Sequence, residues 1–246
     1  MFLFSLSLSV SAQTEEECKD PEEGFVKDTK EVVSHIYSAQ QTSNLFAAIK
    51  AKDLKAVKAA LAKNANPSFL LEEKPNLTAL SYTVEFGTPE ILRAILDAGG
   101  DPNATDFNAK ATTPLIQAAR DNKTAFIDVL LDRGFATDVN KTAAGGRSPL
   151  HFAATNHSVA AITRLVKDPY IDLNAKSVFV VGKGDTPLSS LCFYGVIKGV
   201  QALLNHPATT KPVALENLIA AESSLNAEIS VEGKKAIQAY KAKYYP

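Results

Sequence analysis

The sequence is poor in cysteine, lacks long apolar runs and has no excess charge of either sign. Two cysteines among 246 residues exclude a disulfide-dense scaffold and a four-thiolate zinc site. No apolar stretch approaches the roughly 20 residues of a membrane-spanning helix, so we expect no membrane insertion. The 26 basic and 27 acidic residues give a formal net charge of −1, which provides no general attraction to nucleic acid. With 46% hydrophobic residues, the chain can instead build a globular core.

Catalytic and metal-binding motifs are also absent. The sequence contains no HExxH, GxSxG, P-loop or CxxC motif. Among its four histidines, His151 and His157 are six residues apart and therefore do not share one helix face as metal ligands would. We therefore predict a protein that is not an enzyme and holds no metal or cofactor.

The N-terminal residues resemble an export signal. Residues 2–10 are apolar with interleaved serines, and Val10 and Ala12 fit a secretory cleavage site that ends at Ala12. The positively charged segment that usually precedes such a run is missing. A buried N-terminal strand or helix is the alternative, although the switch to acidic residues after residue 13 argues against it. We expect residues 1–12 to be a cleaved signal peptide.

The next segment, residues 13–28, is predicted to be an acidic flexible tail. Residues 13–24 carry six acids against a single lysine, a pattern typical of solvated tails, although docking on a basic partner is an alternative. Five Asn-x-Ser/Thr sequons follow, at Asn76, Asn103, Asn122, Asn140 and Asn156. Several lie within packed repeat units, where a glycan would be awkward, so we expect a bacterial periplasm rather than a glycosylating pathway.

A short motif recurs through the chain with a nearly constant period. It reads SNL at 43–45, TAL at 78–80, TPL at 113–115, SPL at 148–150 and TPL at 186–188, so its starts step by 35, 35, 35 and 38 residues. About sixteen residues after each start comes a second apolar stripe, and a turn cluster follows most of these stripes. Each unit therefore predicts a helix, a tight turn, a second helix and a loop.

Local chemistry supports these helix limits. The Ser or Thr at each motif start can accept from the unpaired N–H groups of the first turn, and Pro at the next position suits a first helical residue. Paired alanines, as at 118–119 and 153–154, allow neighbouring helices to approach closely. Gly87, Asn122 and Gly195 lie between the predicted helices, where we expect a left-handed backbone.

Residues 148–157 (SPLHFAATNH) and 78–103 resemble the ankyrin repeat pattern TPLHxAAxxGH, followed by LL and GADxN. The resemblance covers residues 43–207 and implies an all-α ankyrin-repeat solenoid of about five helix-turn-helix repeats with extended loops. The predicted repeats span 43–77, 78–112, 113–147, 148–185 and 186–207. An extra capping helix is predicted at 29–42, and a degenerate helical cap at 208–246. In this pattern, His151 is a structural residue.

The resemblance also implies that partners bind to the concave face of the first helices and to the protruding loops. Helix positions before the interhelix turns are Glu85, Phe86, Arg120, Asp121, Thr155, Asn156, Phe193 and Tyr194. Packing against the adjacent repeat is the alternative role for their aromatic side chains. In the loops, the apolar residues are Phe107, Phe179, Val180 and Val181. Exposed apolar loop residues of this kind usually mark a partner site.

The two cysteines leave one question open. Cys192 occupies a small-residue position in a first helix, where an inert buried thiol is the usual outcome. A disulfide with Cys18 is the alternative in an oxidising compartment.

These patterns indicate a non-catalytic protein-binding module that is a monomer when free and whose partner is a periplasmic enzyme. Resemblance to periplasmic ankyrin proteins that restrain a cell-wall enzyme favours an inhibitor or immunity protein that occludes a peptidoglycan-cleaving peptidase for self-protection. The alternatives are a periplasmic scaffold that stabilises another enzyme, such as an antioxidant enzyme, and a secreted effector that binds a host protein.

Overall fold

A computed structural model describes residues 37–69, 77–106, 111–178, 185–205, 215–223 and 230–245. The chain divides into two units, Met1–Ile36 and Tyr37–Pro246, and every described residue lies in the second. Within these ranges the regular structure is helical, with isolated backbone bridges such as Ala143–Arg147 and Ser177–Asp185 in the loops. The predicted signal peptide, acidic tail and Cys18 lie outside the described residues.

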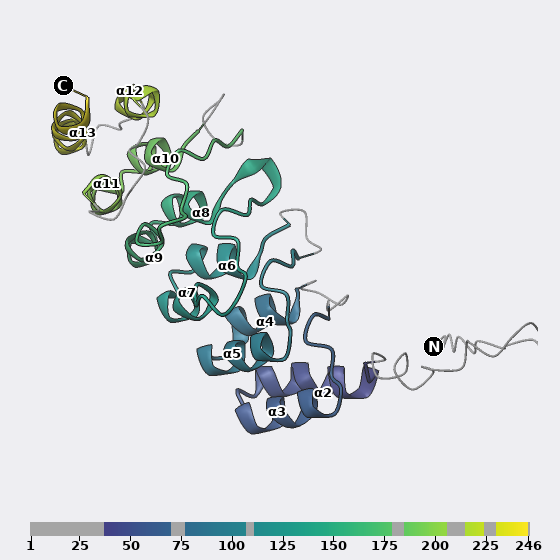
Figure 1. Ribbon diagram of the computed structural model, residues 1–246. Coiled ribbons are helices and arrows are strands. Elements are labelled where there is room, and N and C mark those ends of the chain that lie inside the picture. The colour runs from purple at the N-terminus through teal and green to yellow at the C-terminus, as the bar shows by residue number, and fades with distance from the viewer. Residues whose placement is uncertain are drawn as a thin grey trace, which may run out of the picture. The chain divides into compact units, whose positions relative to one another are not determined.

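Helices follow one another in pairs that stack into two layers (Figure 1). The first helices are α2 (Ala39–Lys50), α4 (Ala79–Phe86), α6 (Pro114–Arg120), α8 (Pro149–Thr155), α10 (Pro187–Phe193) and α12 (Leu215–Ser223). The second helices are α3 (Leu54–Ala62), α5 (Pro89–Asp97), α7 (Thr124–Leu130), α9 (Val159–Leu165), α11 (Ile197–Leu204) and α13 (Ser230–Tyr244). Each helix contacts its pair partner and the equivalent helix of the next pair, which confirms the predicted helical solenoid.

The predicted N-caps are observed in four consecutive pairs. Thr78, Thr113 and Thr186 each accept a hydrogen bond from the backbone N–H three residues on, and Ser148 forms a capping box with His151. Proline is the first residue of α6, α8 and α10, where its missing N–H has no intrahelical partner to lose. These local signals therefore fix the start of each first helix.

The first pair departs from the prediction. α2 begins at Ala39, because Ser38 is its N-cap and accepts from the Gln41 N–H at 3.3 Å. Ser43 lies inside this helix, so the predicted boundary between residues 42 and 43 is wrong. Nothing at position 43 interrupts the helix, since Asn44 stands where the third, fourth and fifth repeats carry proline and its side chain pairs with Gln40 one turn earlier. The rest of the predicted capping helix lies outside the described residues.

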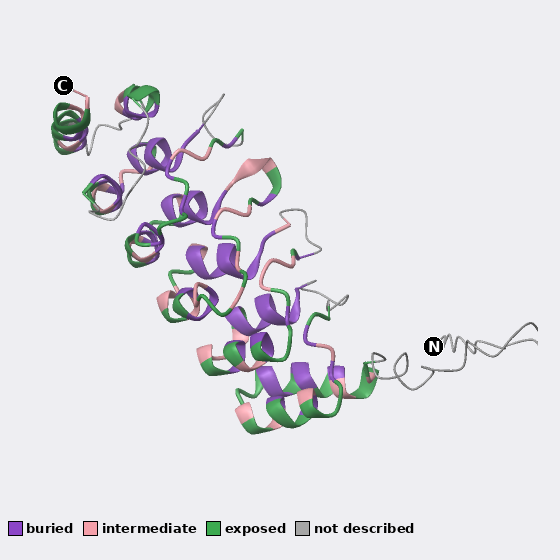
Figure 2. Ribbon diagram, viewed as in Figure 1, coloured by how far each residue is buried: buried purple, intermediate pink, exposed green. Residues whose placement is uncertain are grey.

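The core lies between the two layers and between successive pairs (Figure 2). The leucine of every motif is fully buried, namely Leu45, Leu80, Leu115, Leu150 and Leu188. The alanine pairs at 118–119 and 153–154 are also fully buried, which is how α6 and α8 pack closely. Each buried leucine contributes about 1.5–3 kcal/mol of transfer free energy, so the repeated motif accounts for much of the stacking.

The interhelix turns confirm two of three backbone predictions. Asn122 and Gly195 have left-handed φ angles of 56° and 74°. Gly87 does not: its φ is −93°, so that prediction is wrong. Glycine is required there for space, because an added Cβ would lie 2.8 Å from Thr83 Cγ2. His157, the counterpart of Asn122 in the next pair, adopts the left-handed conformation with φ 57°.

Loop asparagines join successive repeats. Asn103 Nδ2 donates to the Ala136 carbonyl at 2.7 Å, and its Oδ1 accepts from the Asp138 N–H at 2.7 Å. Asn140 makes the same pair of contacts with Tyr170 and Asp172 one repeat later. Both asparagines belong to sequons, so a glycan on either residue would be attached to the nitrogen that donates to the next loop.

The C-terminal helices continue both layers, because α12 packs on α10 and α13 packs on α11. Leu218 and Ala221 of α12 and Ile237 and Tyr240 of α13 are buried in this contact. Lys241 and Glu222 add an ion pair of 2.8 Å between the two helices. None of the helices formed by the described residues is long and apolar enough to cross a membrane.

Candidate functional site

The predicted helix positions form one row along the stack. Two residues from the C-terminal end of each of α4, α6, α8 and α10, either in the last turn or just after it, make up what we call the first-helix row. Its members are Glu85, Phe86, Arg120, Asp121, Thr155, Asn156, Phe193 and Tyr194. The four predicted loop residues, Phe107, Phe179, Val180 and Val181, lie outside the described residues.

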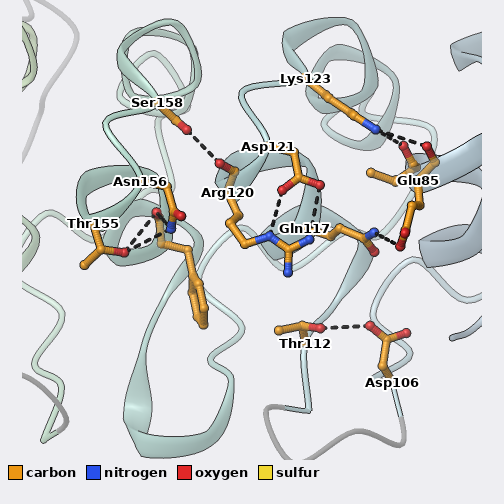
Figure 3. A network of polar contacts seen from close by, with 12 residues as sticks. Glu85, Asp106, Thr112, Gln117, Arg120, Asp121, Lys123, Thr155, Asn156 and Ser158 are labelled. Carbon is orange, nitrogen blue, oxygen red and sulfur yellow. Dashed lines mark hydrogen bonds and ion pairs between the residues drawn. The ribbon is translucent and has the colours of Figure 1, made fainter. Parts of the chain in front are cut away.

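The end of α4 is held by the following repeat. Lys123 Nζ donates to the Val84 and Glu85 carbonyls at 2.6 and 3.3 Å, and Gln117 Nε2 donates to the Glu85 carboxylate at 3.1 Å (Figure 3). These carbonyls have no partner inside the helix, and a cation is favourable at this negative end of the helix dipole. The exposed Glu85 therefore has a fixed position on the row.

Phe86 is partly committed to packing. Its ring is half-buried and lies 4.6 Å from the Tyr82 ring, measured between centroids, and Tyr82 in turn lies 5.1 Å from Phe46. Phe86 thus packs on its own helix, and Tyr82 makes the ring contact with the adjacent repeat. Only the outer part of the Phe86 ring is available to a partner.

Arg120 and Asp121 neutralise each other at the centre of the row. Arg120 Nε and Nη2 donate to the two carboxylate oxygens of Asp121 at 2.7 and 3.2 Å (Figure 3). These hydrogen bonds raise the pKa of the Arg120 guanidinium. Beneath them, buried Asp106 accepts from Thr78 N and Thr112 Oγ1, and its burial raises the pKa of its carboxyl group. The centre of the row is therefore polar, with its main charges already paired.

Thr155 and Asn156 hold the end of α8. Asn156 Nδ2 donates to the Phe152 carbonyl at 2.8 Å and to Thr155 Oγ1 at 3.2 Å. Ser158 Oγ donates to the Arg120 carbonyl at 2.8 Å, so it caps α6 as Lys123 caps α4 (Figure 3). Asn156 is the acceptor residue of a sequon, and its side-chain nitrogen is already used within the helix end.

Phe193 and Tyr194 give the row an aromatic end. Phe193 is 45% exposed, and its ring meets half-buried Tyr194 edge to face at 5.1 Å. Tyr194 also lies 6.3 Å from the His157 ring of the preceding repeat. Phe193 is thus a large apolar side chain at the surface, held by an aromatic neighbour.

The sequence reasoning missed Arg147, which joins this end of the row. Arg147 Nη2 donates to Thr155 Oγ1 at 2.6 Å, and its guanidinium carbon lies 4.2 Å from the centre of the Phe152 ring. One signal was present: the residue before each motif start is Thr42, Leu77, Thr112, Arg147 or Asp185, so this repeat alone carries a cation there.

The residues considered for chemistry are structural. His151 is fully buried; its Nδ1 accepts from the Ser148 N–H at 3.2 Å and its Nε2 donates to the Asp185 carbonyl at 3.1 Å. Cys192 is a free, buried thiol whose pKa burial raises to about 12. In the described part of the chain, no three His, Cys, Asp or Glu side chains gather in a way that could hold a metal ion.

A small cleft of about 260 Å³ lies away from the first-helix row, beyond the ends of α7 and α9. Arg133 lines it, stacked 4.8 Å from the Tyr170 ring centre and 3.5 Å from the Asp168 carboxylate. Arg133 and Asp168 are already paired with each other, and the volume of the cleft is small for a ligand site.

Comparison with known protein families places these helix pairs in a family. The family model described as "Ankyrin repeats (3 copies)" matches residues 44–143 and 106–177, which together cover more than half of the chain. The matched residues include the second part of α2 and all of α3 to α9, and with them the first-helix row from Glu85 to Asn156.

Proposed function

The chain belongs to the ankyrin repeat family, whose repeats mark a protein–protein interaction module, and from this premise we propose that it inhibits a peptidoglycan-cleaving peptidase in the periplasm. In this proposal the chain performs no chemistry, as family members are generally non-catalytic binding modules. Its first-helix row covers the substrate cleft of the enzyme, and the cell that makes both proteins is protected from its own peptidase.

The observation that carries the binding function is Phe193, which is 45% exposed at the aromatic end of a row in which Arg120 and Asp121 are already paired with each other. A partly exposed aromatic ring, held by a neighbour and surrounded by polar groups, is typical of an interface hot spot. Tyr194 holds the ring, so little side-chain entropy is lost when a partner covers it. The row therefore offers a preformed anchor.

Two sequence features support the periplasmic enzyme as the partner. The apolar segment at residues 2–10, followed by Ala12, predicts export. The chain also resembles periplasmic ankyrin proteins that restrain a cell-wall enzyme. Among the partners that a protein-binding module can take, these features favour an enzyme acting on peptidoglycan.

The test is capture followed by an activity assay. Purified chain is incubated with periplasmic extract, the bound enzyme is recovered, and its cleavage of peptidoglycan is measured with and without the chain. We expect inhibition by the wild type and a 10- to 100-fold weaker inhibitor in Phe193→Asp, since an anchor of this kind contributes about 1–3 kcal/mol. Val231→Asp is the matched control, because Val231 is 64% exposed on α13 and outside the row.

Other outcomes separate the alternatives. An enzyme that binds through Phe193 but keeps its activity and gains thermal stability would indicate a scaffold. Binding only to proteins of a host-cell extract would indicate a secreted effector. Equal loss of inhibition in Phe193→Asp and Val231→Asp would contradict the placement of the binding surface on the first-helix row.

A further inference from the structure

Arg147 differs from every other arginine of the chain in its electrostatic partners. The sequence has five arginines, all within the described ranges. Four of them pair with an aspartate: Arg93 with Asp132, Arg120 with Asp121, Arg133 with Asp168 and Arg164 with Asp128. Arg147 alone has no carboxylate oxygen of a described residue within 4 Å. The pattern singles out one half-buried arginine in the described part of the repeat stack.

The Arg147 guanidinium is nevertheless held in a defined position. One of its five N–H donors is used on Thr155 Oγ1 at 2.6 Å, and its plane lies over the Phe152 ring. Burial lowers its pKa, whereas Tyr194 and Asp185 act in the opposite direction. Asp185 is the carboxylate in this balance, but it is buried and accepts from the hydroxyls of Ser189 and Ser190. Arg147 is thus partly dehydrated, and no described residue forms an ion pair with it.

The surroundings of Arg147 are aromatic on one side. Tyr194 lies within electrostatic range of it, Phe193 packs on Tyr194, and both lie at the end of α10. A guanidinium beside a partly exposed aromatic ring is complementary to a ligand that carries a carboxylate next to an apolar side chain. One guanidinium balances one carboxylate, and an overall charge of −1 does not favour a polyanion such as nucleic acid.

We propose that Arg147 binds the carboxylate of an Asp or Glu in the partner protein, on a segment whose adjacent apolar residue packs on Phe193 and Tyr194. This inference rests on the proposed function and names the chemistry that its surface recognises. Forming the ion pair restores a counter-charge to a guanidinium that burial has partly dehydrated. The contact with the Phe152 ring and the hydrogen bond to Thr155 keep the guanidinium oriented. Little further side-chain entropy is therefore lost when the carboxylate binds.

The test begins with a random twelve-residue peptide library displayed on phage and selected on three full-length proteins. They are the wild type, Arg147→Met and Arg133→Met. Arg133 is the matched control, because it also stacks on an aromatic ring but is paired with Asp168. We expect wild type and Arg133→Met to enrich peptides with Asp or Glu beside an aromatic or aliphatic residue. We expect Arg147→Met to lose this enrichment.

A double-mutant cycle then assigns the contact. The best wild-type peptide and its counterpart with Glu or Asp changed to the amide are titrated against both proteins by calorimetry. Removing the peptide charge should weaken wild-type binding at least about tenfold and leave Arg147→Met unchanged, as expected for a charge-assisted hydrogen bond. Circular dichroism melting checks that the variants fold, and Arg147→Lys, which keeps the charge, should retain part of the preference.

The outcomes are decisive in both directions. No acidic enrichment on the wild type, or the same enrichment on Arg147→Met, would overturn the proposal. An enzyme that is captured and inhibited through Phe193, but equally well by Arg147→Met, would also overturn it while leaving the proposed function intact. Loss of both effects together would point to the failure of the binding surface itself.

Discussion

His151 is expected to make one of the largest single contributions to the coupling between the fourth and fifth repeats. The Ser148 N–H can only donate, so Nδ1 of His151 is the acceptor and the ring proton is on Nε2, which donates to the carbonyl of Asp185, the residue just before the N-cap of α10. His151→Ala leaves the buried Ser148 N–H without its partner, at about 1–3 kcal/mol. It also removes one of the two hydrogen bonds to the Asp185 carbonyl, which still accepts from the Ser177 N–H, and it adds a cavity. We therefore expect a loss of about 3–5 kcal/mol in the free energy of unfolding, which is a large share of the stability of an ordinary domain.

Urea denaturation at pH 8, followed by circular dichroism, measures this loss. His157→Asn is the control, because His157 is exposed in a left-handed turn that asparagine also tolerates, and we expect a change within about 0.5 kcal/mol. The reasoning is refuted if His151→Ala costs less than about 1 kcal/mol, since the ring would then not bridge the two repeats.

The same histidine should give the protein a pH dependence. Burial lowers the pKa of His151, so below about pH 6.5 the unfolded chain binds a proton that the folded chain does not. The contribution of His151 to the free energy of unfolding is therefore fully present above pH 6.5. It falls as the pH drops below this value, by at most about 2 kcal/mol at pH 5. His151→Gln should remove this part of the pH profile, and an unchanged profile would contradict the assignment.

Three further predictions test the packing. Gly87→Ala should lower the free energy of unfolding by about 1–3 kcal/mol, because the new Cβ meets Thr83, whereas Gly134→Ala, whose nearest atom is 3.8 Å away, should change it by less than about 0.5 kcal/mol. Cys192 should resist Ellman's reagent at pH 8 until urea unfolds the protein; immediate reaction would contradict its burial. Asn140→Ala should cost about 1–2 kcal/mol in denaturation, while an unchanged midpoint would mean that the loop bridge is dispensable.

Features encoded by neighbouring residues could be predicted from the sequence. The Ser/Thr cap, the proline after it and the buried leucine all act within one turn, so four of the five first-helix starts follow directly from the motif. The first pair was misjudged because Ser38, five residues before the motif, supplies a cap of the same chemistry. Ser38 and Ser43 are equally suitable N-caps, and the sequence alone does not show at which of them the helix begins.

Features that depend on the next repeat could not be predicted from local patterns. Lys123 caps the end of α4 although it lies 38 or more residues further along the sequence. Whether Arg147 has an ion-pair partner depends on where the carboxylates lie in three dimensions, as the pairing of Arg133 with Asp168 illustrates. Gly87 was assigned a left-handed φ because glycine permits one, whereas its actual reason is contact with Thr83. The first-helix row was located from the repeat register, but the pairing of its charges required the structure.

Amide hydrogen exchange on the complex with the captured enzyme tests the central claim most directly. The account predicts that binding slows exchange in the turns at 120–123, 155–158 and 193–196. These turns contain residues of the first-helix row and join α6, α8 and α10 to the second helices. Slower exchange confined to the second-helix layer, in α5, α7 and α9, would contradict it, because the partner would then cover the opposite side of the repeats.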